Sequence, residues 1–250
     1  IRHLPTEAFR TQNRGGKGLK GVTTKEEDRP QAIITCFSKD RLLIFTNKGR
    51  VYGLKAWETP LASRQAKGTH VRNLLEGIRE DESVITILPI SKELLENHSN
   101  HYLLFATSKG LIKKTLLEHY VRINRNGKYA IKFKVEGDSL VNVRTATDEY
   151  DIVLISNKGL AARFPCKNIT STGRNTSGVW GIRTGSRGDG GHVVGMIATD
   201  NYDTQILSIT KNGMGKRTKL GTAERIPDLD ANGIQRLDKE DNLKFITDGY

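Results

Sequence analysis

The stretch of the sequence best suited to binding a charged ligand is residues 11–21, TQNRGGKGLKG, where glycines alternate with Arg14, Lys17 and Lys20. Glycine has no side chain to pack and loses the most backbone entropy on ordering, so this stretch is a poor strand or helix. A loop of this composition brings backbone N–H groups and cationic side chains against a polyanion. The alternative is a flexible hairpin tip that has no ligand.

Residues 16–21 also fit the G-x-G-x-x-G spacing of a dinucleotide-binding fold. That motif requires a strand before the glycines and a helix that begins at them. Residues 22–30 have no apolar stripe at helical spacing and end at Pro30. The context therefore excludes a dinucleotide site, and the sequence contains no P-loop motif.

The overall charge favours an anionic partner. Lysine and arginine number 40 against 28 aspartate and glutamate, for a formal net charge of +12, and they are spread along the chain as a basic surface rather than a tail. We find no basic amphipathic helix, long apolar run or signal peptide, so we expect a soluble, cytoplasmic protein with no membrane partner. Because the first residue is Ile1 rather than methionine, we expect a fragment of a longer polypeptide.

Two residue types that often carry chemistry have structural interpretations here. Cys36 and Cys166 lie far apart, beside apolar runs and outside any C-x-x-C motif, which predicts two unpaired thiols rather than a disulfide or a zinc site. Trp57 and Trp180 are suited to stacking on unpaired bases, but packing in a buried core is the favoured interpretation.

Helix signals are scarce. Residues 91–98 begin with Ser91, a good N-cap, and predict a short helix within an insertion. His98 and His101 lie three residues apart after it. We interpret them as part of a solvated tip rather than as metal ligands.

A short unit recurs along the chain: an apolar strand, a turn that ends in glycine, and a strand that returns at once. The apolar strands are residues 43–46, 104–107, 153–156 and 207–209, with a fifth copy at 244–249, and the turn glycines are Gly49, Gly110, Gly159, Gly213 and Gly249. The returning strands are residues 50–54, 111–114, 160–164 and 214–217.

The repeat spacing of about 50 residues is typical of a propeller whose blades have room for four strands. Residues 1–5 look like the return strand of an earlier copy, which gives six units with the first and last incomplete. The last interval is the shortest, so we expect either a deletion in residues 222–241 or residues missing from the numbered chain there.

A basic turn also recurs, at one fixed place after each complete hairpin: residues 63–68, 124–128 and 172–178. Equivalent positions of a repeat lie at equivalent sites around a ring, so these cations predict a basic belt along which a polymer can bind. The cations of the returning strands are expected to face outward and join it. The candidate DNA-binding residues are Gln12, Arg14, Gly15, Gly16, Lys17, Gly18, Lys20, Arg64, Lys67, Lys113, Lys114, Arg125, Lys128, Arg163, Arg174, Lys216 and Arg217.

Residues 12–18 resemble the motif Gln-Arg-Arg-Gly-Gly-Lys-Gly, which marks the C-terminal domain of the bacterial DNA gyrase A protein, part of a type IIA topoisomerase. Asn13 stands where the motif has an arginine, and the other positions match. The repeated hairpins and the Gly-Lys-Arg-Thr segment at 215–218 extend the resemblance over residues 1–250, which we expect to form a single domain.

The resemblance implies an all-β fold, a six-bladed β-pinwheel in which neighbouring blades exchange strands. It implies a domain that wraps duplex DNA around a basic rim and so enables gyrase to introduce negative supercoils at the bacterial nucleoid. The domain is expected to hold no catalytic residue, metal or cofactor, with ATP and Mg²⁺ used in other parts of the holoenzyme. The implied partners are double-stranded DNA, the rest of the gyrase A protein and, through it, the gyrase B protein.

Other functions remain open from the sequence. The equivalent domain of topoisomerase IV would bind and orient DNA crossings without strong wrapping. A protein-binding propeller would carry the basic belt only as a solvated rim, and an enzyme would place its site in the central channel.

Overall fold

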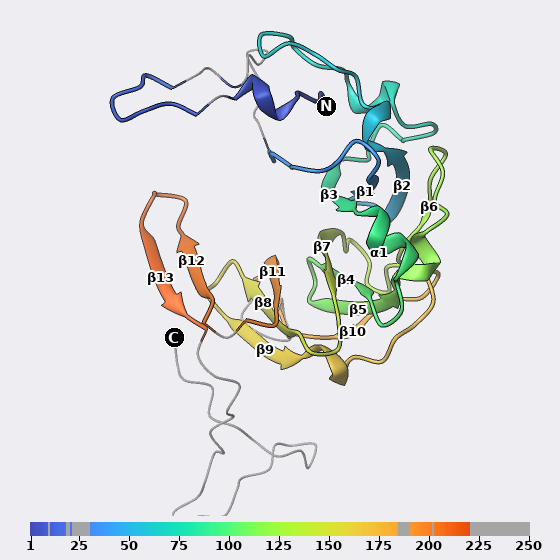
Figure 1. Ribbon diagram of the computed structural model, residues 1–250. Coiled ribbons are helices and arrows are strands. Elements are labelled where there is room, and N and C mark those ends of the chain that lie inside the picture. Colours follow the sequence, from blue (N-terminus) through green and yellow to red (C-terminus); the bar gives the residue numbers. More distant parts are fainter. Residues whose placement is uncertain (10, 19–20, 22–30, 185–190, 202, 221–250) are drawn as a thin grey trace, which may run out of the picture. The chain divides into compact units, whose positions relative to one another are not determined.

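The computed structural model of the chain describes residues 1–9, 11–18, 21, 31–184, 191–201 and 203–220, which are mostly strands and turns (Figure 1). The chain divides into two compact units, Ile1–Ala198 and Thr199–Tyr250. The all-β prediction is confirmed. A single domain over residues 1–250 stays a prediction.

The described strands form four antiparallel sheets, in the orders β3-β1-β2-β6, β10-β5-β4-β7, β11-β8-β9 and β12-β13. The strands are β1 (Arg41–Thr46), β2 (Arg50–Lys55), β3 (Val84–Ile90), β4 (Tyr102–Thr107), β5 (Leu111–Leu116), β6 (Lys128–Tyr129), β7 (Leu140–Ala146), β8 (Asp151–Ser156), β9 (Ala161–Pro165), β10 (Val179–Trp180), β11 (Val193–Thr199), β12 (Gln205–Ile209) and β13 (Gly215–Lys219). The described helices are short: η1 (Thr6–Ala8), η2 (Ala56–Glu58), η3 (Val71–Asn73), α1 (Lys92–Glu96), η4 (Leu117–Tyr120) and η5 (Cys166–Asn168).

Each sheet is built on one of the predicted hairpins, namely β1-β2, β4-β5, β8-β9 and β12-β13. The turn glycines have left-handed φ angles, 73° at Gly49 and 97° at Gly110, which glycine adopts without a steric penalty. A Cβ atom at Gly110 would also lie 2.1 Å from the carbonyl oxygen of Ile182. The four hairpin predictions before residue 220 are confirmed, and the fifth, ending at Gly249, lies outside the described residues.

The residue that opens the hairpin turn also fixes the third strand of the sheet. Asn47 Oδ1 accepts a hydrogen bond from the backbone N–H of Ser83 at 2.9 Å, and Asn157 Oδ1 accepts one from His192 at 2.9 Å. These contacts lie at the start of β3 and β11, which pair with β1 and β8 respectively. The asparagine of the Asn-Lys-Gly turns therefore sets where the third strand begins.

The fourth strand of a sheet comes from the next repeat. β6 follows β5 in the chain yet pairs with β2, through Arg50 opposite Tyr129 and Val51 opposite Lys128. In the same way β10 follows β9 and pairs with β5. Figure 1 shows the short strands β6 and β10 beside these earlier sheets. The predicted exchange of strands between blades is confirmed for these two pairs.

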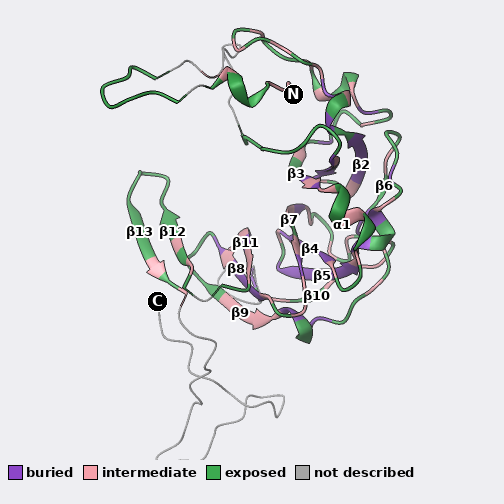
Figure 2. Cartoon of the chain, in the orientation of Figure 1, coloured by how far each residue is buried: buried purple, intermediate pink, exposed green. Residues whose placement is uncertain are grey.

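Two hydrophobic clusters lie between successive sheets. One cluster joins β1, β3, β4 and β7 around Phe45, Phe105 and Tyr120, and the rings of Phe45 and Phe105 meet edge to face with centroids 5.7 Å apart. A second cluster joins β4, β5, β8 and β11. Figure 2 shows β4 buried along its length, whereas β13 is largely exposed. Aromatic pairs of this kind contribute about 0.5–1.5 kcal/mol beyond their buried area.

Some predictions outside the hairpins also have clear outcomes. The short helix α1 is confirmed, and Ser91 Oγ caps it by accepting the N–H of Leu94 at 3.1 Å. The buried packing expected for the tryptophans is wrong, because Trp57 and Trp180 are 57% and 42% exposed. Trp57 lies on the short helix η2 and Trp180 on the two-residue strand β10, at the edge of its sheet. None of the described helices is long and apolar enough to cross a membrane.

Candidate nucleic-acid interface

The glycine-rich stretch forms a compact exposed loop over residues 11–18. The backbone N–H of Gly16 bonds to the carbonyl of Asn13 at 3.0 Å, and Gln12 Oε1 accepts the N–H of Gly18 at 2.9 Å. Arg14 and Lys17 are exposed on this loop. Gln12 thus closes the loop, so that its cations project from a defined turn. Lys20 lies outside the described residues.

The three later basic turns are also ordered by their own hydrogen bonds. Ala66 N bonds to the carbonyl of Ser63 at 3.1 Å, and Gly127 N bonds to that of Asn124 at 3.2 Å. In the third turn Thr176 Oγ1 donates to the carbonyl of Gly173 at 2.7 Å. Their cations reach the surface: Lys67, Arg125 and Lys128 are exposed, and Arg64 and Arg174 are half-buried.

A cation from an earlier part of the chain holds each of these turns by its carbonyl oxygens. Arg2 donates to Arg64 O at 2.9 Å and also to Gly21 O at 2.8 Å, which ties the turn to the end of the glycine-rich stretch. Arg50 donates to Asn126 O at 3.1 Å. These bonds end on main-chain carbonyls, so they do not occupy the side chains of the turns.

Lys113 serves the third turn in the same way. Its Nζ donates to Arg174 O and to Ala130 O, both at 2.7 Å. The side chain is 1% exposed. Burial, with a smaller contribution from the positive charge of Arg174, lowers the pKa of the Lys113 ammonium to about 7.

The prediction that the cations after the hairpin glycines face outward is therefore wrong at β5. Lys114 is 4% exposed and bonds to Asp148 at 2.7 Å and to Cys166 O at 3.1 Å. Strand β5 lies inside its sheet, with β10 on one edge and β4 on the other, and polar groups meet it on both faces. Both lysines are consequently internal donors, and neither presents a cation for DNA.

The return-strand cations of the later sheets differ from one another. Arg163 is half-buried, and its Nε bonds to Asp151 Oδ2 at 2.8 Å, so part of its charge is used within the sheet. Lys216 and Arg217 are exposed on β13, in the second compact unit. The same repeat position thus carries structural cations in one sheet and surface cations in another.

The sequence matches the family model of the DNA gyrase C-terminal domain, beta-propeller, over residues 2–35, 40–91, 101–147, 150–200 and 204–227. The chain belongs to this family. The last four matched segments each contain one of the hairpins described above, and the first contains the glycine-rich loop. The gyrase C-terminal domain family is a non-catalytic part of the gyrase A protein.

The chain is 42% identical over 221 residues to the DNA gyrase A protein of Staphylococcus aureus strain MRSA252, a match that covers 88% of this chain and 24% of the relative. It therefore spans about a quarter of the length of this gyrase relative.

Two solved structures have a similar fold. The C-terminal domain of DNA topoisomerase IV aligns with a TM-score of 0.66 and 24% identity, over 91% of this chain and 75% of that chain. The DNA gyrase A C-terminal domain aligns with a TM-score of 0.59 and 22% identity, over 80% and 64% respectively.

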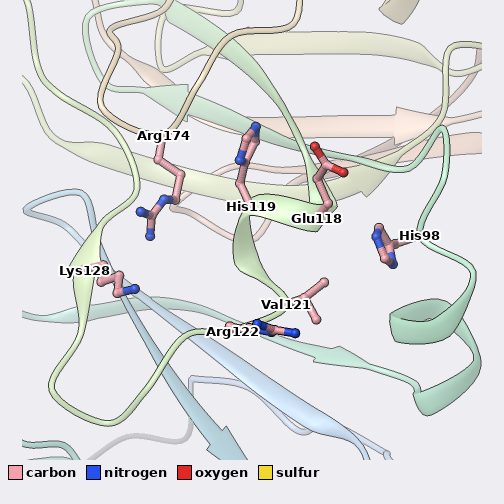
Figure 3. A pocket seen from close by; sticks show the side chains of 7 residues that line it. All are labelled: His98, Glu118, His119, Val121, Arg122, Lys128 and Arg174. Carbon is pink, nitrogen blue, oxygen red and sulfur yellow. The ribbon is translucent and has the colours of Figure 1, made fainter.

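One group of residues in this gyrase-family chain escaped the sequence-based prediction. A hollow of about 330 Å³ gathers Arg122, His119 and His98 with the turn residues Lys128 and Arg174 and with Glu118 (Figure 3). His98 was expected on a solvated tip, yet it lines this hollow. Of Arg122, His119 and Glu118, only Arg122 had a signal in the sequence, its position just before the turn at 124–128.

Proposed function

We propose that this domain binds duplex DNA through backbone phosphates and wraps it. The observation that carries the proposal is the recurrence of exposed or half-buried cations on glycine-containing turns whose main chains are bonded by an arginine or lysine from earlier in the chain. Arg2, Arg50 and Lys113 each donate to carbonyls of such a turn. Phosphate contacts of this kind give sequence-independent affinity that falls with salt.

Fixed turns suit a wrapping function better than mobile ones. DNA has a persistence length of about 50 nm, so bending it around a small domain costs several kcal/mol. A cation on a flexible loop follows the DNA as it straightens, whereas a cation on an anchored turn resists that movement. The hydrogen bonds to the turn carbonyls therefore support bending as well as binding.

The wider assignment follows from the family. We propose that the domain acts with the rest of the gyrase A protein and with the gyrase B protein on chromosomal DNA in the bacterial cytoplasm. Strand cleavage, ATP hydrolysis and Mg²⁺ binding belong to those other parts, and the wrap would set the direction of supercoiling. The proposed contact residues are Gln12, Arg14, Gly15, Gly16, Lys17, Gly18, Lys20, Arg64, Lys67, Arg125, Lys128, Arg163, Arg174, Lys216 and Arg217.

A second candidate is the role of the topoisomerase IV C-terminal domain, whose fold gives the higher of the two TM-scores above, 0.66. A domain of that kind would bind DNA without trapping much writhe. The glycine-rich loop with Arg14 and Lys17 favours the gyrase role.

Plasmid topology separates these functions. Nicked plasmid is incubated with the domain, sealed with ligase, stripped of protein and resolved by gel electrophoresis. Wrapping shifts the linking number in proportion to bound protein. Strong binding without a shift supports the topoisomerase IV role. Weak binding with a salt slope near zero supports a protein-binding propeller and overturns the proposal.

A further inference from the structure

The hollow beside η4 brings together basic side chains from separate parts of the chain. Lys128 comes from the turn at 124–128, Arg174 from the turn at 172–178, and Arg122 from the segment between η4 and the first of these turns. Figure 3 shows Lys128 and Arg174 to the left of the hollow, Arg122 below it, and Glu118 and His98 to the right, with His119 between Arg174 and Glu118. The hollow is therefore lined by cations from the turns of two successive repeats.

These three cations have no anionic partner within the described part of the chain, where no ion pair joins Arg122, Lys128 or Arg174 to a carboxylate. Arg125, in contrast, is paired with Glu58 at 2.8 Å. Like charges held together repel one another, and an anion that enters the hollow relieves that repulsion. The unpaired set is thus suited to an anionic ligand.

The main chain beneath the cations is fixed. Arg41 donates to the carbonyl of Ile123, a fully buried residue next to Arg122. Lys128 is paired with Val51 in the exchanged strand, and the carbonyl of Arg174 is bound by Lys113 Nζ. The main chain that carries the cations is consequently fixed before any ligand arrives.

The lining of the hollow contains no tryptophan or tyrosine on which a base could stack. His98 Nδ1 lies 2.9 Å from the carbonyl of Leu95 and donates to it, so Nε2 donates to an anion only in the doubly protonated ring. Arginine forms paired hydrogen bonds to phosphate oxygens. The lining matches a phosphate group better than a base.

We infer that this hollow is a phosphate subsite that receives one phosphodiester group of the duplex where it passes between two repeats. This inference rests on the proposed function and assigns a binding role to Arg122 and to His119, which lines the same hollow. A free phosphate compound has the same chemistry, so the test must separate the two sources.

The first test measures duplex affinity of the 250-residue chain against salt concentration. Arg122→Gln should reduce the slope of log K against log salt by about 0.9, which corresponds to an affinity loss of about eightfold at 0.1 M salt. Arg122→Lys keeps the charge and should retain most of the slope. Lys92→Gln is the matched control, because Lys92 is exposed on α1 and already paired with Glu96 at 3.5 Å.

The second test titrates inorganic phosphate against chloride at constant ionic strength and follows the ring signals of His119 and His98 by NMR. Phosphate-specific shifts in the parent chain that are lost in Arg122→Gln, together with the reduced DNA slope, support the inference. If Arg122→Gln binds DNA like Lys92→Gln, the DNA subsite is overturned, even where free phosphate binds. If the parent chain fails to bind duplex, the proposed function itself fails.

Discussion

The ammonium of Lys113 lies 2.7 Å from the carbonyl oxygen of Arg174, so a buried side chain in one repeat holds the basic turn of the next. A lysine in this position has no carboxylate partner among its hydrogen bonds, which go to main-chain oxygens. It links the stability of the fold to the placement of the proposed DNA-binding turn.

Replacing Lys113 with alanine should destabilise the domain. The change leaves Arg174 O without this donor and removes a buried aliphatic stem, for an expected loss of about 2–4 kcal/mol in the free energy of unfolding. Urea unfolding monitored by circular dichroism measures it. Lys109→Ala is the control, since Lys109 is exposed and should change stability by about 0.5 kcal/mol or less. Equal midpoints for the two variants would show that Lys113 does not hold the turn.

The same lysine should make stability depend on pH. Its pKa is about 7 in the folded chain against an ordinary value of 10.5. Between these values the unfolded chain binds a proton that the folded chain has released, so the free energy of unfolding rises with pH. This gain in the free energy of unfolding is complete above pH 10.5 and is lost as the pH falls through 7. The free energy of unfolding of the parent minus that of Lys113→Met, measured by urea unfolding at pH 7, 8.5 and 10, should increase with pH. A constant difference would contradict the lowered pKa of Lys113.

Replacing the loop residues 12–18 with alanine should separate wrapping from binding. Gly15 and Gly18 have φ angles of 85° and 71°, so alanine strains the turn. Affinity for linear DNA should stay within about tenfold because other turns still contact phosphates, whereas the plasmid linking number should shift little. A control that changes only Arg14 and Lys17 to glutamine keeps the loop and tests the charge alone. Full wrapping by the alanine variant would assign the decisive contact to another turn.

The two cysteines are free and should react differently. Cys36 is exposed, and Cys166 is fully buried with its thiol pKa raised to about 11 by burial. Because the thiolate is the reactive form, brief treatment with iodoacetamide at pH 8 should add one group, at Cys36. The same treatment in urea should add two. Intact-mass measurement reads both numbers, and an early adduct at Cys166 would show that its surroundings open readily.

The hairpins could be predicted because local chemistry determines them. An apolar run ending at Asn47-Lys48-Gly49 both encodes the strand and requires the left-handed glycine that closes the turn. The exchanged strands had no such signal. β6 and β10 are two residues long, and their pairing depends on which sheet edge lies nearby.

The candidate interface was predictable where it lies on turns and unpredictable where it lies on strands. Glycine-containing turns such as 124–128 expose their cations for local reasons. Lys113 and Lys114 lie on a strand that is buried on both faces. The alternation of polar and apolar residues in the sequence does not reveal that both faces are buried. The role inferred for Arg122 depends on Arg174, which is distant in the sequence and reaches the hollow only through the fold.

The pairing of β2 with β6 sets the order in which this domain can be completed during translation. The first sheet keeps an open edge at Arg50 and Val51 until the ribosome has delivered Lys128 and Tyr129. The second sheet waits in the same way for Val179 and Trp180. Unpaired edges of this kind attract other strands. These two nascent sheets therefore stay exposed to misassembly until the strand from the next repeat emerges.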